Sequence, residues 1–304
     1  MNRIVIVKKL TRLEELIREH LTMNAATFDL ESREQSITPY EQEHATYEAA
    51  LAEIRRQLPS DIQTAEVTRE ELPNFLFRET DFIIVCGPDG LFANLAKYVQ
   101  DQLVLTVNPD QSSIAGVLML FSPQEVGSQI ALVQGNKHRT ECLPFVKACV
   151  DDDRIVWGIN DVFVGRKDHV SARYEIEFGG KKELQSSSGI IVSTGVGATG
   201  WIRSIATMLD GLNGGRRPHL LSTLPQPTAK ELVFVVREPF PSPNTGTSII
   251  TGRITPGRPL IVRSHMPKGG YLFSDGGVEK AISWNAGATV AITVGERFIT
   301  RIIR

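Results

Sequence analysis

The sequence has few cysteines, and their arrangement points to neither a bridge nor a metal site. Its three cysteines, Cys86, Cys142 and Cys149, show no C-x-x-C spacing and cannot all pair with one another. Structural zinc sites need closely spaced thiolates, and disulfides persist mainly in oxidising compartments. The sequence therefore predicts neither a disulfide framework nor a structural zinc site, and we expect a cytoplasmic protein.

Long apolar runs and an excess of charge of one sign are also missing. No stretch reaches the ~18 apolar residues of a membrane-spanning helix, and the apolar run at residues 4–7 is too short for a signal peptide. The 33 basic and 35 acidic residues give a net charge of −2, which predicts no general affinity for nucleic acids or anionic membranes. We expect neither a nucleic acid nor a membrane among the partners.

The first part of the chain, residues 1–118, alternates between strand and helix patterns. A capping-box pattern at Thr11 and Glu14 begins one helix, and Thr38 with Pro39 begins a second. Apolar runs typical of strands lie at residues 3–7, 62–67, 81–85 and 103–107. This order predicts an α/β domain with a mostly parallel sheet.

The remainder, residues 119–304, carries short strand patterns separated by turn residues. Residues 173–178 alternate with period two and are followed by Gly179 and Gly180, which is typical of a tight hairpin. Strands at this spacing predict an all-β sandwich domain. A chain of 304 residues can bury two cores, so we place the boundary at residues 118 and 119, allowing for the last residues to pack back on the first domain.

The main candidate for chemistry is Asp89, which lies in a turn between Gly87 and Gly90. The turn directly follows the apolar run at residues 81–85, and open α/β sheets bind ligands at the carboxyl ends of their strands. The two glycines would let the backbone approach a phosphate closely. The plainer alternative is a strand-to-helix turn with Asp89 as its N-cap.

Two further polar segments are candidates for binding a ligand. Asn108 follows the apolar run at residues 103–107, so we expect it at the same edge of the sheet as Asp89. Asn160 and Asp161 interrupt an apolar segment, and an amide beside a carboxylate can bind ribose hydroxyls or an adenine edge. The alternatives are an Asn-Pro turn for the first segment and a solvated turn on an edge strand for the second.

A glycine-rich loop at residues 193–201 is the next candidate. It follows an apolar strand pattern and precedes a helix, so its backbone N–H groups and hydroxyls could hold a phosphate. Its glycine spacing fits neither a P-loop nor a Rossmann fingerprint, and the alternative is a loop whose glycines only supply positive φ angles. The candidate residues here are Thr194, Gly195, Gly197, Thr199 and Trp201.

Taken together, these motifs resemble those of the NAD kinase family, whose superfamily also includes diacylglycerol and sphingosine kinases. In that family a Gly-Gly-Asp-Gly-Thr turn, an Asn-Glu pair and a Thr-Gly-Ser-Thr-Ala-Tyr-like loop occur in this order. The counterparts here are residues 87–91, Asn160 with Asp161, and residues 197–201, and Asp275 lies in a turn that resembles the family's late Asp-Gly turn. The resemblance covers residues 81–300, and each motif is degenerate.

The resemblance implies an enzyme that uses ATP and Mg²⁺ to transfer a phosphoryl group to a hydroxyl of NAD or a related nucleotide. Asp89 would accept the proton of the attacking hydroxyl, Asn160 and Asp161 would hold the acceptor, and Trp201 would stack on a nucleotide ring. The other residues implied in nucleotide binding are Gly87, Gly90, Asn108, Thr194, Gly195, Gly197, Thr199 and Asp275. No protein ligand to a metal is predicted, and a homo-oligomer is expected because family members commonly self-associate.

Four positions depart from the family pattern. Pro88 removes a backbone N–H from the turn, and Leu91 replaces a hydroxyl residue. Asp161 is one methylene shorter than the usual Glu, and Ala198 replaces a Ser. These departures leave two alternatives open: a nucleotide-binding sensor without catalysis, and a kinase of another acceptor such as a nucleoside, a sugar or a lipid.

Overall fold

Residues 1–112, 116–151, 153–214 and 224–304 are described by a computed structural model of the chain. The chain divides into unit 1, made of Met1–Glu141 with Ile299–Arg304, and unit 2, made of Cys142–Phe298. The boundary predicted at residues 118 and 119 lies inside unit 1, because the helix that follows it packs on the core of that unit. The end of the chain also belongs to unit 1.

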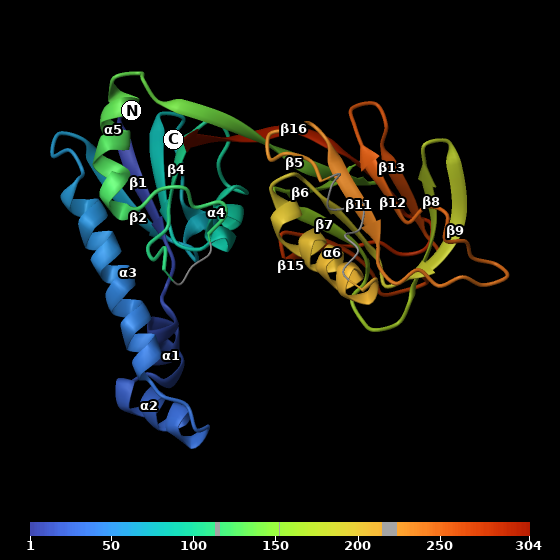
Figure 1. The fold of residues 1–304 in the computed structure, drawn as a ribbon, viewed down its shortest axis with the longest axis horizontal. Helices are drawn as coiled ribbons and strands as arrows, with labels where there is room; N and C mark the ends of the chain where they lie inside the picture. Colours follow the sequence, from blue (N-terminus) through green and yellow to red (C-terminus); the bar gives the residue numbers. More distant parts are fainter. Residues whose placement is uncertain (113–115, 152, 215–223) are drawn as a thin grey trace. The chain divides into compact units, whose positions relative to one another are not determined.

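A parallel sheet forms the centre of unit 1 (Figure 1). Its strands lie in the order β2-β1-β3-β4, and the end of β16 pairs in parallel with β4. Because β1 and β3 are neighbours while β2 lies on the other side of β1, the strand order reverses at β1 and β3. The strands are β1 (Arg3–Lys8), β2 (Gln63–Thr68), β3 (Asp81–Cys86) and β4 (Leu103–Val107).

Helices cover both faces of this sheet. Figure 1 shows α3 (Thr38–Arg56) and α5 (Val126–Gln134) on one face and α4 (Asp89–Leu95) on the other. On the first face, alternate residues of β1 and β3 are apolar, and they pack against α3 and α5. Short 3-10 turns lie at Leu72–Asn74 and Pro123–Glu125.

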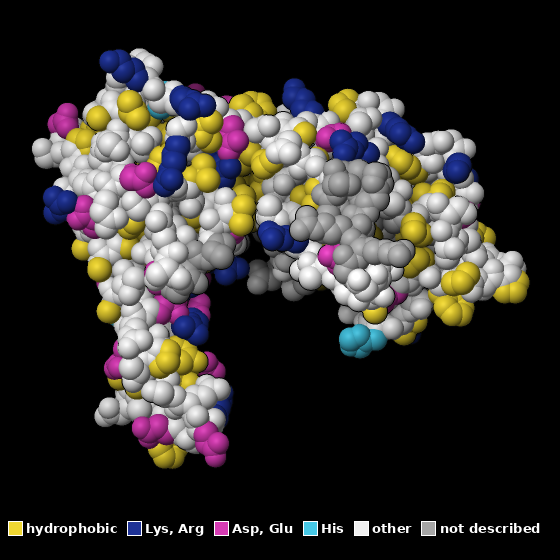
Figure 2. Space-filling model, in the orientation of Figure 1, with side chains coloured by type: hydrophobic (Ala, Val, Ile, Leu, Met, Phe, Trp, Pro, Cys, Tyr) yellow, Lys and Arg dark blue, Asp and Glu magenta, His cyan; other side chains and the backbone are white. Residues whose placement is uncertain are grey.

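Two short helices, α1 (Arg12–His20) and α2 (Met23–Ser32), lie beside the N-terminal part of α3 (Figure 1). The capping box that the sequence predicts for α1 is present. The sequence did not predict α2, whose apolar residues form no helical stripe: Leu30 is buried while Phe28 is 74% exposed. Figure 2 shows apolar side chains on the surface of this pair of helices.

Unit 2 consists of two antiparallel sheets that share one core. The first joins β5, β6, β8, β9, β13 and most of β16, and the second has the order β12-β11-β10-β7-β14-β15. The strands are β5 (Arg139–Val150), β6 (Arg154–Gly158), β7 (Asp161–Arg166), β8 (Ala172–Phe178), β9 (Lys181–Ser187), β10 (Ile190–Ser193), β11 (Leu232–Val236), β12 (Thr251–Ile254), β13 (Leu260–Ser264), β14 (Gly270–Ser274), β15 (Gly277–Ser283) and β16 (Thr289–Ile303). The helix α6 (Trp201–Leu212) and a 3-10 turn at Gly197–Thr199 complete the unit.

The predicted fold class, an α/β domain followed by an antiparallel sandwich, is confirmed. The hairpin between β8 and β9 is also as predicted, with Gly179 and Gly180 both at positive φ, as a tight hairpin turn requires. The strands β12 and β13 flank a turn but do not pair with each other, because each joins a different sheet. Of the helices in the described ranges, none combines the length and the apolar character needed to cross a membrane.

Candidate functional site

Asp89 lies where β3 passes into α4, at the edge of the sheet formed by the carboxyl ends of β1, β3 and β4. The backbone N–H of Gly87 donates to the carbonyl of Val107 at 3.1 Å, which ties this turn to the end of β4. Asp89 is the first residue of α4, and the N-cap position belongs to Pro88. The alternative of Asp89 as an N-cap is therefore wrong.

The carboxylate of Asp89 instead binds a segment that follows β4. Its Oδ2 accepts a hydrogen bond from the backbone N–H of Val117 at 3.1 Å, and its Oδ1 accepts one from Leu118 at 3.0 Å. These two bonds fix the position of the carboxylate, because two neighbouring amides bind its two oxygens. No local sequence pattern indicates this contact, because the two amides lie 28 and 29 residues after Asp89.

Asn108 lies against the same segment. A Cβ added to Gly116 would approach Asn108 Nδ2 to 3.1 Å and Asp89 Oδ1 to 3.5 Å, so both side chains border this glycine. The Oδ1 atom of Asn108 accepts a hydrogen bond from the backbone N–H of Asp110 at 3.0 Å, as in an Asx turn. The structure therefore brings Asn108 and Asp89 to one edge of the sheet.

The two glycines of the turn differ in what they allow. A Cβ on Gly87 would lie 2.8 Å from Cδ2 of Leu91, so a side chain there would collide with the helix that carries Asp89. Around Gly90 the described residues place no atom within 4 Å of such a Cβ. A side chain at Gly87 would therefore displace the end of Leu91 and would be strained at a φ of +156°, whereas Gly90 leaves the start of α4 open.

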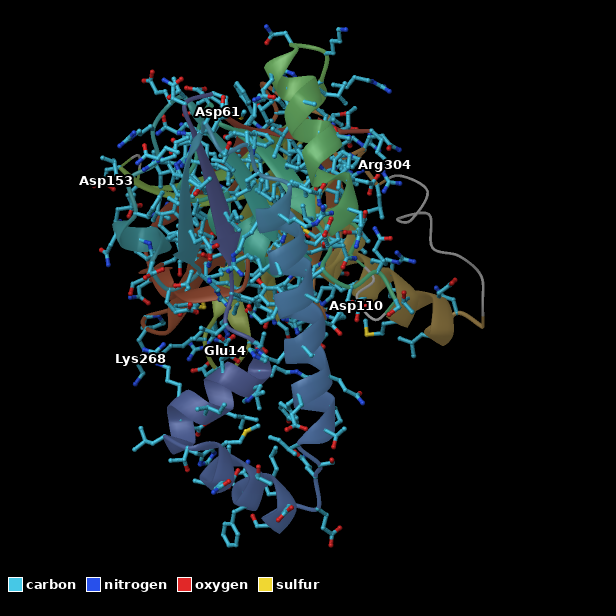
Figure 3. The ribbon with its side chains drawn as sticks, turned by 90° about the vertical axis from the view of Figure 1, so that its left-hand side faces the viewer. Glu14, Asp61, Asp110, Asp153, Lys268 and Arg304 are labelled. Carbon is cyan, nitrogen blue, oxygen red and sulfur yellow. The ribbon has the colours of Figure 1, made fainter. Side chains whose placement is uncertain are left out.

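A cleft of about 570 Å³ lies beside this turn, within unit 1. Its walls include Lys9 and Arg12 after β1, Glu43 on α3, Pro88 before Asp89, and Asp110. Figure 3 shows Asp110 beside the middle of α3. A volume of this size suits a small ligand, and the cleft lies where the strand order reverses, which is where open α/β sheets bind ligands.

The hydroxyl of Tyr47 ties α3 to this edge of the sheet. It donates to the carbonyl of Cys86 at 2.8 Å and accepts from the backbone N–H of Lys9 at 3.1 Å. Burial raises the pKa of Tyr47, so the phenol stays neutral and keeps its proton for the first of these bonds. Tyr47 thereby holds the ends of β1 and β3 together.

In unit 2, Asn160 and Asp161 lie at the start of β7, a central strand of the second sheet. The carboxylate of Asp275 accepts hydrogen bonds from the backbone N–H groups of both, at 2.8 and 3.2 Å, and from that of Ile159 at 3.1 Å. Asp161 is 8% exposed. The alternative of a solvated turn on an edge strand is therefore wrong.

The environment of Asp161 favours its protonated form. Burial, and then the nearby carboxylate of Asp275, raise the pKa of Asp161 to about 7. The buried Oδ1 of Asn160 has no hydrogen-bond partner among the residues that the structure describes. A buried carboxyl and an amide oxygen thus lie together, as expected of a site that binds polar groups of a ligand.

The glycine-rich loop packs directly on this turn. Thr194 donates from its hydroxyl to the carbonyl of Ile159 at 2.5 Å, and its backbone N–H donates to that of Asn160 at 2.9 Å. A Cβ on Gly197 would lie 2.1 Å from the carbonyl oxygen of Asn160, and one on Gly195 would lie 2.0 Å from that of Gln226. Close backbone packing therefore requires these glycines.

Neither Gly195 nor Gly197 has a positive φ, so the alternative that the glycines of this loop only supply positive φ angles is wrong. Several amides of the loop are used within the protein: the N–H of Gly197 donates to the Thr194 hydroxyl at 3.1 Å, and that of Ala198 donates to the Thr194 carbonyl at 3.0 Å. The hydroxyl of the exposed Thr199 donates to the carbonyl of Val196 at 3.1 Å. The loop is built mainly to hold Asn160 and its neighbours.

Trp201 begins α6 and takes part in an aromatic cluster. Its ring stacks on Phe163, with centroids 5.7 Å apart and an angle of 17° between the planes. Phe273 lies 5.1 Å from Phe163, and the guanidinium of Arg237 lies 5.5 Å from the Trp201 ring. Since Phe163 is two residues after Asp161 on β7, the cluster shares one face of the sheet with that carboxyl.

The predicted site residues thus form two groups, each within one unit. Unit 1 holds Gly87, Asp89, Gly90 and Asn108, and unit 2 holds Asn160, Asp161, Thr194, Gly195, Gly197, Thr199, Trp201 and Asp275. In the described part of the chain, no three His, Cys, Asp or Glu side chains are grouped so as to hold a metal ion. Sequence reasoning missed Lys9, Arg12 and the segment that binds Asp89.

A parallel α/β sheet with an acidic turn at its carboxyl edge, followed by an antiparallel sandwich, defines the class of fold. No protein-family model and no curated protein matches the sequence. Among solved structures, yeast NADH kinase in complex with NADH is similar at 13% identity and a TM-score of 0.65, covering 99% of this chain and 83% of that one. An NAD kinase from Archaeoglobus fulgidus in complex with ATP is similar at 16% identity and a TM-score of 0.60, covering 99% and 93%. The chain therefore has the NAD kinase fold, in a divergent sequence.

Proposed function

We propose that this protein is an ATP-dependent kinase that transfers a phosphoryl group to a hydroxyl of NAD or a related nucleotide. The observation that carries the proposal is the held carboxylate of Asp89 at the carboxyl edge of a sheet, in a chain whose fold matches two nucleotide kinases over 99% of its length. That edge is where α/β sheets bind ligands. We also propose that the protein acts in the cytoplasm, because its three cysteines form no disulfide pattern, and that it self-associates, because its motifs resemble those of the NAD kinase family.

Asp89 would act as the general base. Its carboxylate takes the proton of the acceptor hydroxyl while the hydroxyl oxygen forms a bond to the γ-phosphorus of ATP and the bond from that phosphorus to the bridging oxygen breaks. The products are the phosphorylated acceptor and ADP, and the proton leaves Asp89 afterwards. Proton transfer of this kind contributes about 10² to 10⁴ in rate, and the rest comes from positioning and charge neutralisation.

Unit 2 would hold the acceptor. Asp161 and the unpartnered Oδ1 of Asn160 provide acceptors for ribose hydroxyls or for the amino group of adenine. The loop around Thr194 and the carboxylate of Asp275 keep this pair in place through the backbone bonds described above. These contacts support binding of a nucleoside moiety.

The cleft in unit 1 supports binding of a phosphate-bearing donor. Lys9 and Arg12 place two cations at its wall, although both also pair with Glu43. Mg²⁺ would neutralise charge on the phosphates. It usually binds through substrate phosphates with one or two carboxylates, a donor set that needs no cluster of protein ligands, and Asp110 at the cleft is one such carboxylate.

A transfer assay tests the role of Asp89. Purified protein is incubated with ATP, Mg²⁺ and NAD, NADH, nucleosides or sugars, and the products are followed by mass spectrometry. We expect Asp89→Asn to lower kcat by about 10² to 10⁴ while nucleotide affinity changes little. Asp101→Asn, which changes an exposed aspartate outside both groups of site residues, is the matched control and should retain the wild-type rate. Equal rates for Asp89→Asn and the wild type would overturn the assignment.

One observation favours a second candidate, a nucleotide-binding sensor. Both oxygens of the Asp89 carboxylate already accept a backbone hydrogen bond, and Pro88 removes an N–H that could touch a phosphate. Calorimetric titration separates the two functions. Binding of NAD or ATP without turnover of any acceptor would favour the sensor, whereas turnover that depends on Asp89 favours the kinase.

A further inference from the structure

Arg301 is a buried arginine near the end of β16, between Ile299 and Ile302 in the sequence. Arg301 is 4% exposed, and it lies on the part of β16 that belongs to unit 1. Burying a guanidinium is costly unless its N–H groups are bonded. Arg301 meets this requirement: its Nε donates to Glu141 Oε1 at 2.9 Å, its Nη2 also bonds Glu141, and its Nη1 donates to the carbonyl of Leu118 at 2.8 Å.

Leu118 links this cation to Asp89. The N–H of Leu118 donates to the Asp89 carboxylate, and the carbonyl of the same residue accepts from Arg301. The guanidinium also lies 6.0 Å from the ring of Phe92, which is on α4 three residues after Asp89. Arg301 therefore contacts both the helix that carries Asp89 and the segment that binds its carboxylate.

The segment has little room to shift without disturbing the two polar side chains at this edge. Gly116 lies so close to Asn108 and Asp89 that even a methyl group there would touch both. Residues 116–118 adopt neither helix nor strand, so no regular backbone pairing holds them in place. The bond from Arg301 to Leu118 is a fixed anchor for a segment of this kind, because the guanidinium is itself held by Glu141.

A role of Arg301 and Glu141 as an ion pair that only stabilises the fold would not account for the bond to Leu118. Buried ion pairs often contribute little to stability compared with apolar residues of similar volume. The pairing of β16 with β4 does not require a charged side chain at this position, whereas the contact of the guanidinium with the Phe92 ring is one between a cation and an aromatic face. Among the described residues, the guanidinium bonds Glu141 and the carbonyl of Leu118, and the amide of Leu118 binds Asp89.

We propose that Arg301 is a positioning residue for Asp89, acting through Leu118, and that Glu141 holds Arg301 in the required orientation. The effect of Arg301 on the rate of phosphoryl transfer rests on the proposed function, whereas its effect on the Leu118 amide does not. Arg301 touches neither substrate nor reacting atoms in this role. It sets the place of the carboxylate that would take the proton.

Two readouts on the full chain test this role. In Arg301→Met we expect the hydrogen exchange of the Leu118 amide, measured by NMR, to become about tenfold faster or more, while exchange of amides in β3 stays unchanged. We also expect kcat to fall about tenfold with little change in KM for either substrate, since misplacing a reacting group affects the chemical step. Arg301→Lys should give intermediate values, because an ammonium can reach one of the two acceptors but cannot bind both as a planar fork does.

The matched control is Arg304→Met, which changes the exposed arginine three residues later that Figure 3 labels and should leave both readouts unchanged. Unchanged exchange of the Leu118 amide in both Arg301 variants overturns the proposal. If Arg301→Met does not fold, Arg301→Lys alone decides between these outcomes. If the wild type transfers no phosphoryl group, the proposed function fails, and the exchange rates still decide the role of Arg301.

Discussion

At the scale of single residues, Asp161 makes the stability of the protein depend on pH. Its pKa is about 7 in the folded chain against an ordinary value of 3.8, so the folded state keeps a proton that the unfolded state has lost between these values. The contribution of Asp161 to stability is therefore full below about pH 4, falls as pH rises, and levels off above about pH 7. At ~1.4 kcal/mol per pKa unit, the total change is up to about 4 kcal/mol.

This dependence predicts the behaviour of Asp161→Asn, which cannot ionise. The wild type should lose more free energy of unfolding than the variant when the pH rises from 5 to 8. Urea denaturation of both proteins at both pH values measures this difference. Asp101→Asn, at an exposed position, should follow the wild type. Parallel behaviour of Asp161→Asn and the wild type across this range would contradict the raised pKa.

Gly197 gives a steric prediction at the same scale. Its replacement by alanine would force a Cβ to within 2.1 Å of the Asn160 carbonyl oxygen, and we expect a loss of about 2–4 kcal/mol of unfolding free energy. Gly211→Ala is the control, because it lies in α6 with no described atom within 4 Å of the new methyl group. It should stabilise the chain by up to about 1 kcal/mol through helix propensity. Equal stability of the two variants in thermal unfolding would contradict the packing of this loop.

At the scale of elements, Tyr47 connects α3 to the ends of β1 and β3. Tyr47→Phe keeps the buried ring but removes the bonds to Cys86 and Lys9, which should lower the free energy of unfolding by about 1–2 kcal/mol. Tyr40→Phe, earlier on the same helix, leaves such buried bonds untouched and should change stability by no more than about 0.5 kcal/mol. Denaturant unfolding measures both, and an unaltered midpoint for Tyr47→Phe would argue against this link.

The elements were partly predictable from local patterns. The parallel strands, the capped helix at Thr11 and the hairpin at Gly179 carry strong periodicity or turn chemistry, and the structure confirms them. The sequence did not predict α2 because its apolar residues form no single stripe: Ala26 and Leu30 are buried, but Phe28 is exposed. The contact of Asp275 with the backbone at Asn160 spans more than a hundred residues of sequence, so no local pattern could show it. Arg301 left one signal, a charged residue close to the apolar residues Ile299, Ile302 and Ile303.

At the scale of the whole molecule, the chain crosses between the units twice, at residues 141–142 and 298–299. Unit 2 is continuous in sequence and has its own apolar core between two sheets. We therefore expect the fragment 142–298 to fold alone, with a cooperative melting transition by circular dichroism. The fragment 1–141 lacks the end of β16, which is one of the two strands that pair with β4 and which carries the Arg301 that bonds Leu118. It should melt at a lower temperature than a fragment in which a short linker joins residue 141 to residues 299–304. Equal melting temperatures of the two fragments would contradict the assignment of residues 299–304 to unit 1.

The central claim is that Asp89 serves phosphoryl transfer from ATP to a nucleotide hydroxyl. The most direct test follows a label on the γ-phosphate of ATP in a reaction with NAD or NADH and Mg²⁺, with products separated by chromatography. The account predicts that the label appears in the phosphorylated dinucleotide with the wild type and with Asp101→Asn, and that Asp89→Asn transfers it about 10² to 10⁴ times more slowly. Label that stays on ATP or appears only as free phosphate, while the dinucleotide still binds, would contradict it.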